Sequence, residues 1–265
     1  IPLRLVGSEM CIRDRSANRY ARFENTAIIN SDVCIANSKA TKEDFLKRYL
    51  VPENWDCEVI YWGVDTEMFT IDNPINQELR NRFGCSENGI LLLAVGRLAA
   101  RKGYGSLLKA FALVNTEFPD SRLVIVGRGH LRSRLLKQAD KLGISSSVFI
   151  ESSMSFLELA SLFRSADLTI YPSYYEGQGL IPLESMSSGT PVVTVDHGPL
   201  PEMVDSTVGA LFTMGDVNSM SSTILDEIKD KKILEKKGIA GRKRVTENFT
   251  YEIDADYFIK IYSRV

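Results

Sequence analysis

The sequence predicts an α/β fold in which helices cover both faces of a parallel sheet. From residue 89 onward, short apolar segments alternate with helical segments, which is the pattern of strands joined by crossover helices. Ile90–Val95 is the longest uninterrupted apolar run, and Gly89 and Gly96 flank it, as expected of a strand buried on both faces. We therefore expect a Rossmann-like domain over residues 89–247.

A smaller unit is expected over residues 16–65, ahead of this domain. Ser38 is a suitable N-cap for a helix that ends near Leu50. The apolar side chains of Phe45 and Tyr49, four residues apart, support this helix. The other segments predicted in this part are a helix over 16–31, strands over 32–37 and 57–61, and an aperiodic linker over 66–74.

Residues 66–88 are assigned to the linker and the first helix of the large domain, and residues 248–265 to a C-terminal helix. In the large domain, helical spacing is clearest at Tyr104, Leu107, Leu108 and Phe111. The predicted strands are 90–95, 123–126, 147–150, 167–171 and 191–195, and the predicted helices are 76–83, 104–118, 131–142, 156–163, 179–188, 217–228, 231–247 and 251–262.

Residues 1–15, IPLRLVGSEMCIRDR, do not fit this organisation. They lack the pattern of a signal peptide and show no helical or strand periodicity. The string resembles translated sequencing-adapter DNA, so we expect a non-native, disordered leader on a truncated chain.

Composition excludes several classes of protein. The formal charge of −2 gives no bulk attraction for nucleic acid, and the apolar runs are too short to span a membrane. Cys11, Cys34, Cys57 and Cys85 are too dispersed for a zinc site or a disulfide framework, so reduced thiols are expected. We expect a cytoplasmic, cytosol-facing protein. The basic run over 229–244 is interpreted as a solvated helix face, with attraction to a membrane surface as the alternative.

The segment YPSYYEGQGLIPLE, residues 171–184, lies where a parallel strand leads into a helix. Such carboxyl edges bind ligands in open α/β sheets, and a helix N-terminus suits phosphate. Gly177 and Gly179 let a ligand approach the backbone, while Glu176 and Glu184 suit sugar and ribose hydroxyls. The alternative is that Glu184 is a surface residue and the glycines are ordinary turn formers.

Arg97 and Lys102 follow the first strand of the domain and are expected at the same edge. Two fixed cations there would neutralise a diphosphate that gains charge as its bond to a sugar breaks. Arg101, in the same loop, is interpreted as simply solvated.

These motifs occur in an order that resembles family 4 of the retaining glycosyltransferases, over roughly residues 16–265. The matching elements are Arg97 with Lys102, Gly127-Arg128-Gly129, Ala166-Asp167, Pro172-Ser173, the Glu176-x7-Glu184 pair, Gly189–Val193, Gly198–Glu202 and the crossing Ile60–Asp65. The resemblance implies the C-terminal, nucleotide-sugar-binding half of a GT-B fold. It also implies that 16–65 is the remnant of an acceptor-binding N-terminal domain, against which the last helix packs.

The resemblance assigns roles to individual residues. Arg97 and Lys102 would grip the diphosphate, Glu176 would contact the donor sugar, and Glu184 would hold the ribose. The backbone around Gly177, Gln178, Gly179 and Leu180 would support phosphate and sugar, and Gly127, Ser153 and Met154 would border the base. The implied reaction moves a hexose from a UDP- or GDP-sugar with retention, without bound metal or another cofactor.

Three residues depart from the family pattern. Trp62 stands where asparagine is usual, Gln178 where phenylalanine is common, and Ser152 where glycine is frequent. None removes a charge that the chemistry needs. With most of the acceptor domain absent, we expect weak donor binding without transfer. The acceptor is unidentified (sugar, lipid or protein), and peripheral membrane contact of the full-length protein stays open.

Three other functions were weighed. A dehydrogenase is disfavoured because Arg132 stands where the third glycine of a dinucleotide fingerprint belongs. A glycoside hydrolase could use Glu176 and Glu184 as its carboxylate pair, although the neighbouring cations favour a phosphorylated donor. A non-catalytic nucleotide-sugar-binding or scaffolding protein is the main alternative.

Overall fold

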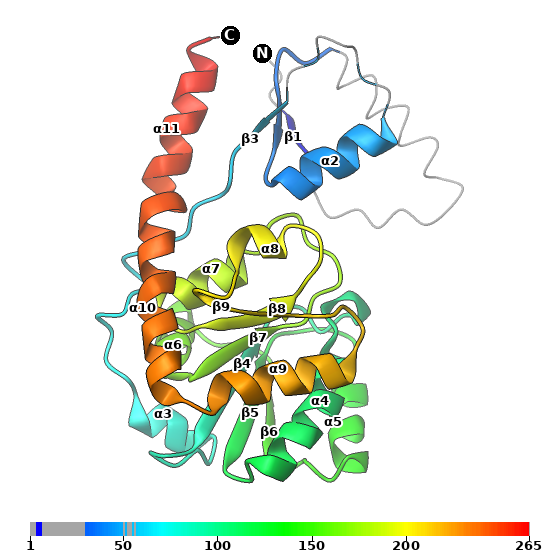
Figure 1. Ribbon diagram of the computed structural model, residues 1–265, viewed down its shortest axis with the longest axis vertical. Helices are drawn as coiled ribbons and strands as arrows, with labels where there is room; N and C mark the ends of the chain where they lie inside the picture. The colour runs from blue at the N-terminus through cyan, green and yellow to red at the C-terminus, as the bar shows by residue number, and fades with distance from the viewer. Residues whose placement is uncertain (1–3, 7–29, 50, 52–54, 56, 265) are drawn as a thin grey trace.

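The computed structural model describes residues 4–6, 30–49, 51, 55 and 57–264, and within them two parallel sheets. The larger sheet has six strands in the order β6-β5-β4-β7-β8-β9, all paired in parallel (Figure 1). Its strands are β4 (Ile90–Val95), β5 (Ser121–Val126), β6 (Val148–Glu151), β7 (Leu168–Tyr171), β8 (Val192–Val195) and β9 (Gly209–Phe212). The predicted Rossmann-like sheet is confirmed.

Strand β4 is buried along its whole length because it faces a hydrophobic core on each side. Leu92 and Ala94 belong to one core, whereas Leu91 and Leu93 belong to the other. The alternation follows from the two-residue repeat of a strand. A continuous apolar run is therefore what this central position requires.

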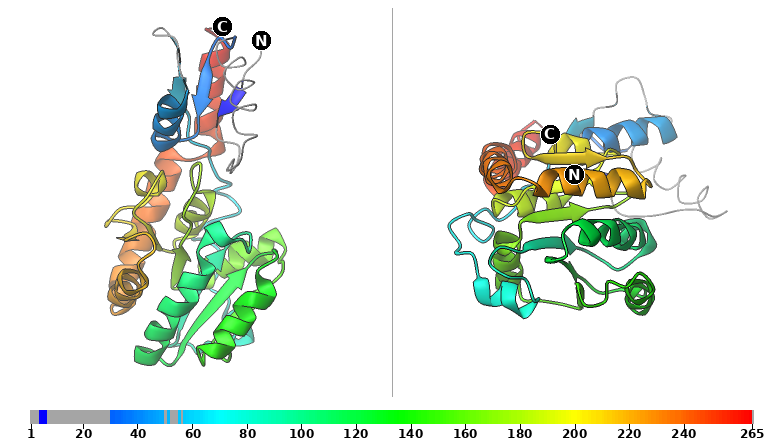
Figure 2. Two further views of the ribbon diagram at one scale, coloured as in Figure 1. Left: turned by 90° about the vertical axis from the view of Figure 1, so that its right-hand side faces the viewer. Right: turned by 60° about the horizontal axis from the view of Figure 1, so that its bottom comes forward.

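Helices cover both faces of this sheet (Figure 2). α4 packs against α5 and α9 on one face, while α6 packs against α3 and α7 on the other. α10 contacts both α7 and α9. Their bounds are α3 (Gln77–Arg82), α4 (Tyr104–Glu117), α5 (Arg132–Lys141), α6 (Phe156–Ser165), α7 (Leu180–Ser187), α8 (Leu200–Met203), α9 (Val217–Ile228) and α10 (Lys231–Asn248), with a short 3-10 turn η1 (Ala100–Lys102).

The smaller unit contains the sheet β1-β2-β3 and the helix α2. Ser38 caps α2 by accepting a hydrogen bond from the Thr41 N–H, as predicted. The C-terminal helix α11 returns to this unit, where Ile261 packs with Ile35 and Ile60. The bounds are β1 (Arg4–Val6), β2 (Cys34–Ala36), α2 (Lys39–Arg48), β3 (Cys57–Val59) and α11 (Tyr251–Tyr262).

The structure corrects three expectations. Residues 4–6 form strand β1, paired in parallel with β2, although no regular structure was expected in the leader. Three residues are too few for periodicity to show, and pairing with an existing strand supplies the order. The short elements α8 and β9 were not predicted either. The helix expected over 16–31 lies almost wholly outside the described residues, as does Cys11.

The other three cysteines are buried thiols, as expected, and none of them forms a disulfide. Burial raises the pKa of the Cys85 thiol, which keeps it protonated and unreactive. Among the described residues, no helix has the length and apolar character needed to cross a bilayer.

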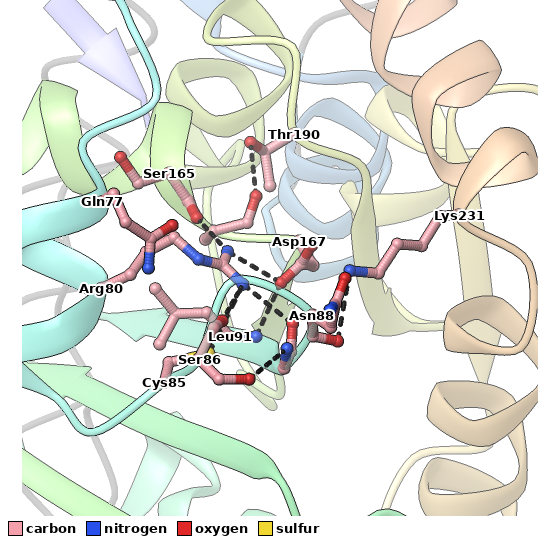
Figure 3. A network of polar contacts seen from close by, with 12 residues as sticks. Gln77, Arg80, Cys85, Ser86, Asn88, Leu91, Ser165, Asp167, Thr190 and Lys231 are labelled. Carbon is pink, nitrogen blue, oxygen red and sulfur yellow. Dashed lines mark hydrogen bonds and ion pairs between the residues drawn. The ribbon is translucent and has the colours of Figure 1, made fainter.

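A buried ion pair ties α3 to the amino ends of β4 and β7 (Figure 3). Arg80 donates to Asp167 Oδ2 at 3.0 Å and to the carbonyls of Ser165 and Gly89 at 2.7 and 2.8 Å. The same Asp167 oxygen accepts the Leu91 N–H at 2.7 Å. This network holds the opposite edge of the sheet from the predicted ligand site.

Replacing Asp167 with asparagine is expected to lower the free energy of unfolding by about 1–3 kcal/mol, because Arg80 loses its charged partner while remaining buried. The matched control is Asp226→Asn, which breaks an exposed ion pair with Lys229 and should cost less than about 1 kcal/mol. Urea titrations of both variants test this. Equal shifts in their midpoints would contradict a special contribution from the buried pair.

Candidate functional site

Strand β7 ends at Tyr171, and a loop leads from there to Gly179, the residue before α7. Gly179 has φ +120°, and a Cβ there would lie 2.9 Å from Cδ2 of Leu200, so both the backbone angle and the space favour glycine. As a glycine, this N-cap residue has no side chain to bond the N-terminus of α7, and no other side chain that the structure describes does so. Its first N–H groups are therefore available to an anion at the carboxyl edge of the sheet.

A second loop, which carries Lys102, is bonded directly to the first. The Tyr174 N–H donates to the Arg101 carbonyl at 2.8 Å, and the hydroxyls of Ser106 and Tyr174 lie 2.8 Å apart. The loops that follow β4 and β7 therefore behave as one surface. Arg101 also donates to the Tyr175 carbonyl at 3.2 Å, so the interpretation of Arg101 as simply solvated is wrong.

Lys102 and Glu176 form an ion pair at the junction of these loops, and their side chains are only 9% and 10% exposed. Lys102 Nζ also donates to the Tyr171 hydroxyl at 3.0 Å. Burial, and then the charge of Glu176, raises the pKa of Tyr171 well above its ordinary value, so the phenol stays protonated. Sequence reasoning missed Tyr171 as a site residue, although its place as the last residue of β7 was visible.

Arg97 lies in the same loop as Lys102 but in a different environment. Its side chain is exposed and has no hydrogen bond or ion pair within the described part of the chain. The backbone beside it is fixed by close approach to Gly127, where a Cβ would lie 1.9 Å from the Gly96 carbonyl oxygen. The Arg97 side chain is thus a solvated cation on a fixed segment of backbone, where an anion can bind to it.

Glu184 is one turn into α7 and is largely withdrawn from solvent. Burial raises the pKa of its carboxyl from 4.5 to about 7. Among the residues that the structure describes, none donates a hydrogen bond to this carboxylate. A partly buried acceptor without a donor among the described residues suits ligand hydroxyls.

The Gln178 side chain faces away from the expected ligand. Its Oε1 accepts the Trp62 N–H at 2.7 Å, and its Nε2 donates to the Trp62 carbonyl at 2.9 Å. The side chain at one departure from the family pattern, Gln178, is therefore bonded to the backbone at another, Trp62. Only the backbone of Gln178 is left for a ligand.

The predicted border of the base lies at the carboxyl ends of β5 and β6. The Gly127 N–H donates to the Glu151 carbonyl at 2.8 Å, which joins these two ends. In the loop before α6, Ser153 is exposed and Met154 packs against the core that lines this face of the sheet. These residues share the edge with Arg97 but do not touch the Lys102–Glu176 pair through any described contact.

The fold is a Rossmann-like domain, and a cluster of polar and charged residues lies at the carboxyl edge of its sheet. Residues 75–244 match the family described as Glycosyl transferases group 1. An MMP alpha-(1->4)-mannosyltransferase from Mycolicibacterium hassiacum is 33% identical over 230 residues, which cover 86% of this chain and 53% of that protein. The chain therefore belongs to the group 1 glycosyltransferase family.

Solved structures show the same fold. Sucrose-phosphate synthase from Thermosynechococcus elongatus aligns with a TM-score of 0.82 at 25% identity, over 96% of this chain and 64% of that one. HepE from Anabaena, solved in complex with UDP, aligns with a TM-score of 0.87 at 22% identity, over 98% and 71%. The predicted GT-B architecture is confirmed, and the chain spans about half the length of the curated relatives it matches.

Proposed function

We propose that the chain is the donor-binding part of a retaining hexosyltransferase that uses a UDP- or GDP-sugar. The observation that carries the proposal is the Lys102–Glu176 pair beside the uncapped N-terminus of α7. A cation and free N–H groups suit a diphosphate, whereas Glu176 and Glu184 suit hydroxyls on either side of it. The mannosyltransferase relative and the UDP complex of HepE support a nucleotide-sugar donor.

Each charged group has a distinct part in this proposal. Arg97 and Lys102 stabilise the negative charge that grows on the diphosphate as the glycosidic bond breaks. Because two protein cations supply that stabilisation, we propose that the reaction needs no bound metal or other cofactor. Glu176 orients the sugar through its hydroxyls, and Glu184 binds the ribose.

The chain covers about half of its relatives, so we propose that it binds donor but does not transfer the sugar by itself. The acceptor is left unassigned, and we propose a cytosol-facing location. Robust transfer to any acceptor by this chain would overturn the proposed inactivity.

Thermal-shift measurements with UDP-, GDP- and ADP-sugars test donor binding. A ligand present at 100 times its Kd adds about 2.7 kcal/mol, which should raise Tm by several degrees for a domain of this size. With Arg97→Gln, about ten times more ligand should be needed for the same shift, as the loss of one charge-assisted bond would require. Tm in buffer should not change, because the side chain is exposed. Arg134→Gln, an exposed cation on α5, is the matched control and should behave as the wild type. No shift with any nucleotide sugar would refute the proposal.

A further inference from the structure

A polar seam joins the proposed donor loop to the smaller unit, and α8 lies on the side of the large domain that faces α2 (Figure 1). We define the seam as Ser38, Thr41, Gly177 and Glu202. The Gly177 carbonyl accepts from the Ser38 hydroxyl at 2.7 Å and from the Thr41 hydroxyl at 2.9 Å. Ser38 is the N-cap of α2 and is fully buried, and Thr41 lies in the first turn of this helix.

Glu202, on α8, completes the seam. Its carboxylate accepts the backbone N–H of Lys39 at 3.0 Å and that of Ala40 at 2.8 Å, and also the Tyr61 hydroxyl at 2.6 Å. An anion at the N-terminus of a ten-residue helix is stabilised by the helix dipole as well as by these bonds. Burial, followed by the hydrogen bond to Glu202, raises the pKa of Tyr61, so its hydroxyl remains a donor.

The seam fixes the direction of a backbone N–H, that of Gln178, which the family resemblance assigns to donor binding. The carbonyl of Gly177 and the N–H of Gln178 belong to one planar trans peptide, in which they point in opposite directions. Because α2 holds the carbonyl, the Gln178 N–H must point away from α2. The oxygen and the nitrogen of the Gln178 side-chain amide are both bonded to the Trp62 backbone, and these bonds oppose rotation of the peptide.

Three successive residues of the loop are therefore held from different parts of the chain. Glu176 is held by Lys102 from the loop after β4, Gly177 by α2, and Gln178 by the crossing segment at Trp62. Only the first of these partners lies in the domain that carries the loop.

We propose that Glu202 and Thr41 are positioning residues for nucleotide-sugar binding, acting through the Gly177–Gln178 peptide. The inference rests on the proposed function, because it states how the smaller unit sets the geometry of the same site. Neither side chain touches the ligand in this scheme. Breaking the seam leaves Lys102, Glu176 and Glu184 in place but frees the peptide between them.

Two variants separate positioning from folding. Thr41→Val keeps the shape of the side chain and removes one hydrogen bond to Gly177, and Glu202→Gln keeps an acceptor but removes the charge at α2. Glu235→Gln, an exposed glutamate on α10, is the matched control. Kd values for UDP and GDP are measured by calorimetry, and amide hydrogen exchange of the loop 176–180 is followed without nucleotide.

We expect both variants to raise Kd by about three- to tenfold, as the loss of one hydrogen bond would. Exchange in the loop should become faster in both variants. Tm in buffer should change little in Thr41→Val but should fall in Glu202→Gln, because the N-terminus of α2 loses its charged acceptor. Kd is therefore measured at a temperature at which both variants are folded. Unchanged exchange would overturn the seam, and faster exchange with unchanged Kd would overturn its positioning role. If the wild type itself binds neither nucleotide, the proposed function fails. This outcome is distinct from the two results above, because both of them require a wild type that binds.

Discussion

Lys102→Met is expected to lower the free energy of unfolding by about 3–5 kcal/mol, which is typical when one partner of a buried ion pair is removed. The side chains of Lys102 and Glu176 are both about nine-tenths buried, so water cannot replace the lost partner. The Tyr171 hydroxyl also loses a donor. Urea denaturation at pH 7 measures the effect, and Lys229→Met, at an exposed pair, should change stability by less than about 1 kcal/mol.

The double variant Lys102→Met with Glu176→Gln distinguishes the structural from the ligand-binding role of the pair. Removing both charges should recover most of the stability, because no uncompensated carboxylate is left buried. Nucleotide-sugar binding should not recover, because the diphosphate has lost a cation. Recovery of both properties would mean that Lys102 only serves to neutralise Glu176. A stable single variant would mean that the pair is not buried in solution.

The pairing of Lys102 also explains why the loop carries a second cation. Within the protein, the charge of Lys102 is already balanced by Glu176, so Lys102 exerts little attraction at a distance. Arg97 is solvated and unpaired among the described residues. We expect Arg97 to dominate the salt dependence of binding, and Lys102 to dominate the geometry of the bound diphosphate.

Local pattern was enough to predict every strand of the larger sheet except β9. The apolar run 90–95 and the glycines beside it predicted β4, because a strand buried on both faces needs such a run. α8 was not predicted because four residues are too few for a helical period to repeat, and β9 was not predicted because it follows this single turn rather than a long helical segment like those before the other strands. The strand β1 has only three residues, and its order depends on pairing with β2 rather than on its own residues.

The site was only partly predictable. Lys102 and Glu176 could be placed together because both follow strands at the carboxyl edge of one sheet. Glu202 was recognised within a motif, but its role depends on α2, more than 160 residues earlier in the chain. No spacing rule connects such positions. The bonds between Gln178 and the Trp62 backbone were hidden likewise, because any residue other than proline at position 62 presents the same N–H and carbonyl groups.

Glu184→Gln is expected to stabilise the protein while weakening ligand binding. Burial raises the pKa of Glu184 in the folded state from 4.5 to about 7. Between these values the folded state holds a proton that the unfolded state has lost, so the free energy of unfolding falls as pH rises from 4.5 to 7. The free energy of unfolding falls by about 3 kcal/mol at most over this range. Glutamine avoids it, so the variant should match the wild type near pH 4 and exceed it in stability at pH 8.

The same titration predicts how donor binding depends on pH. A carboxylate that accepts two hydroxyls must be ionised, so wild-type affinity for a UDP-sugar should rise between pH 6 and pH 8, with proton release on binding. A UDP-sugar is preferable to UDP because a terminal phosphate itself titrates near pH 6. Calorimetry in two buffers of different ionisation enthalpy measures the released proton. In Glu184→Gln the affinity should be lower and the pH dependence lost, whereas Glu235→Gln should retain both. A variant that is more stable at pH 8 yet binds as tightly as the wild type would show that Glu184 is a buried carboxylate without a ligand.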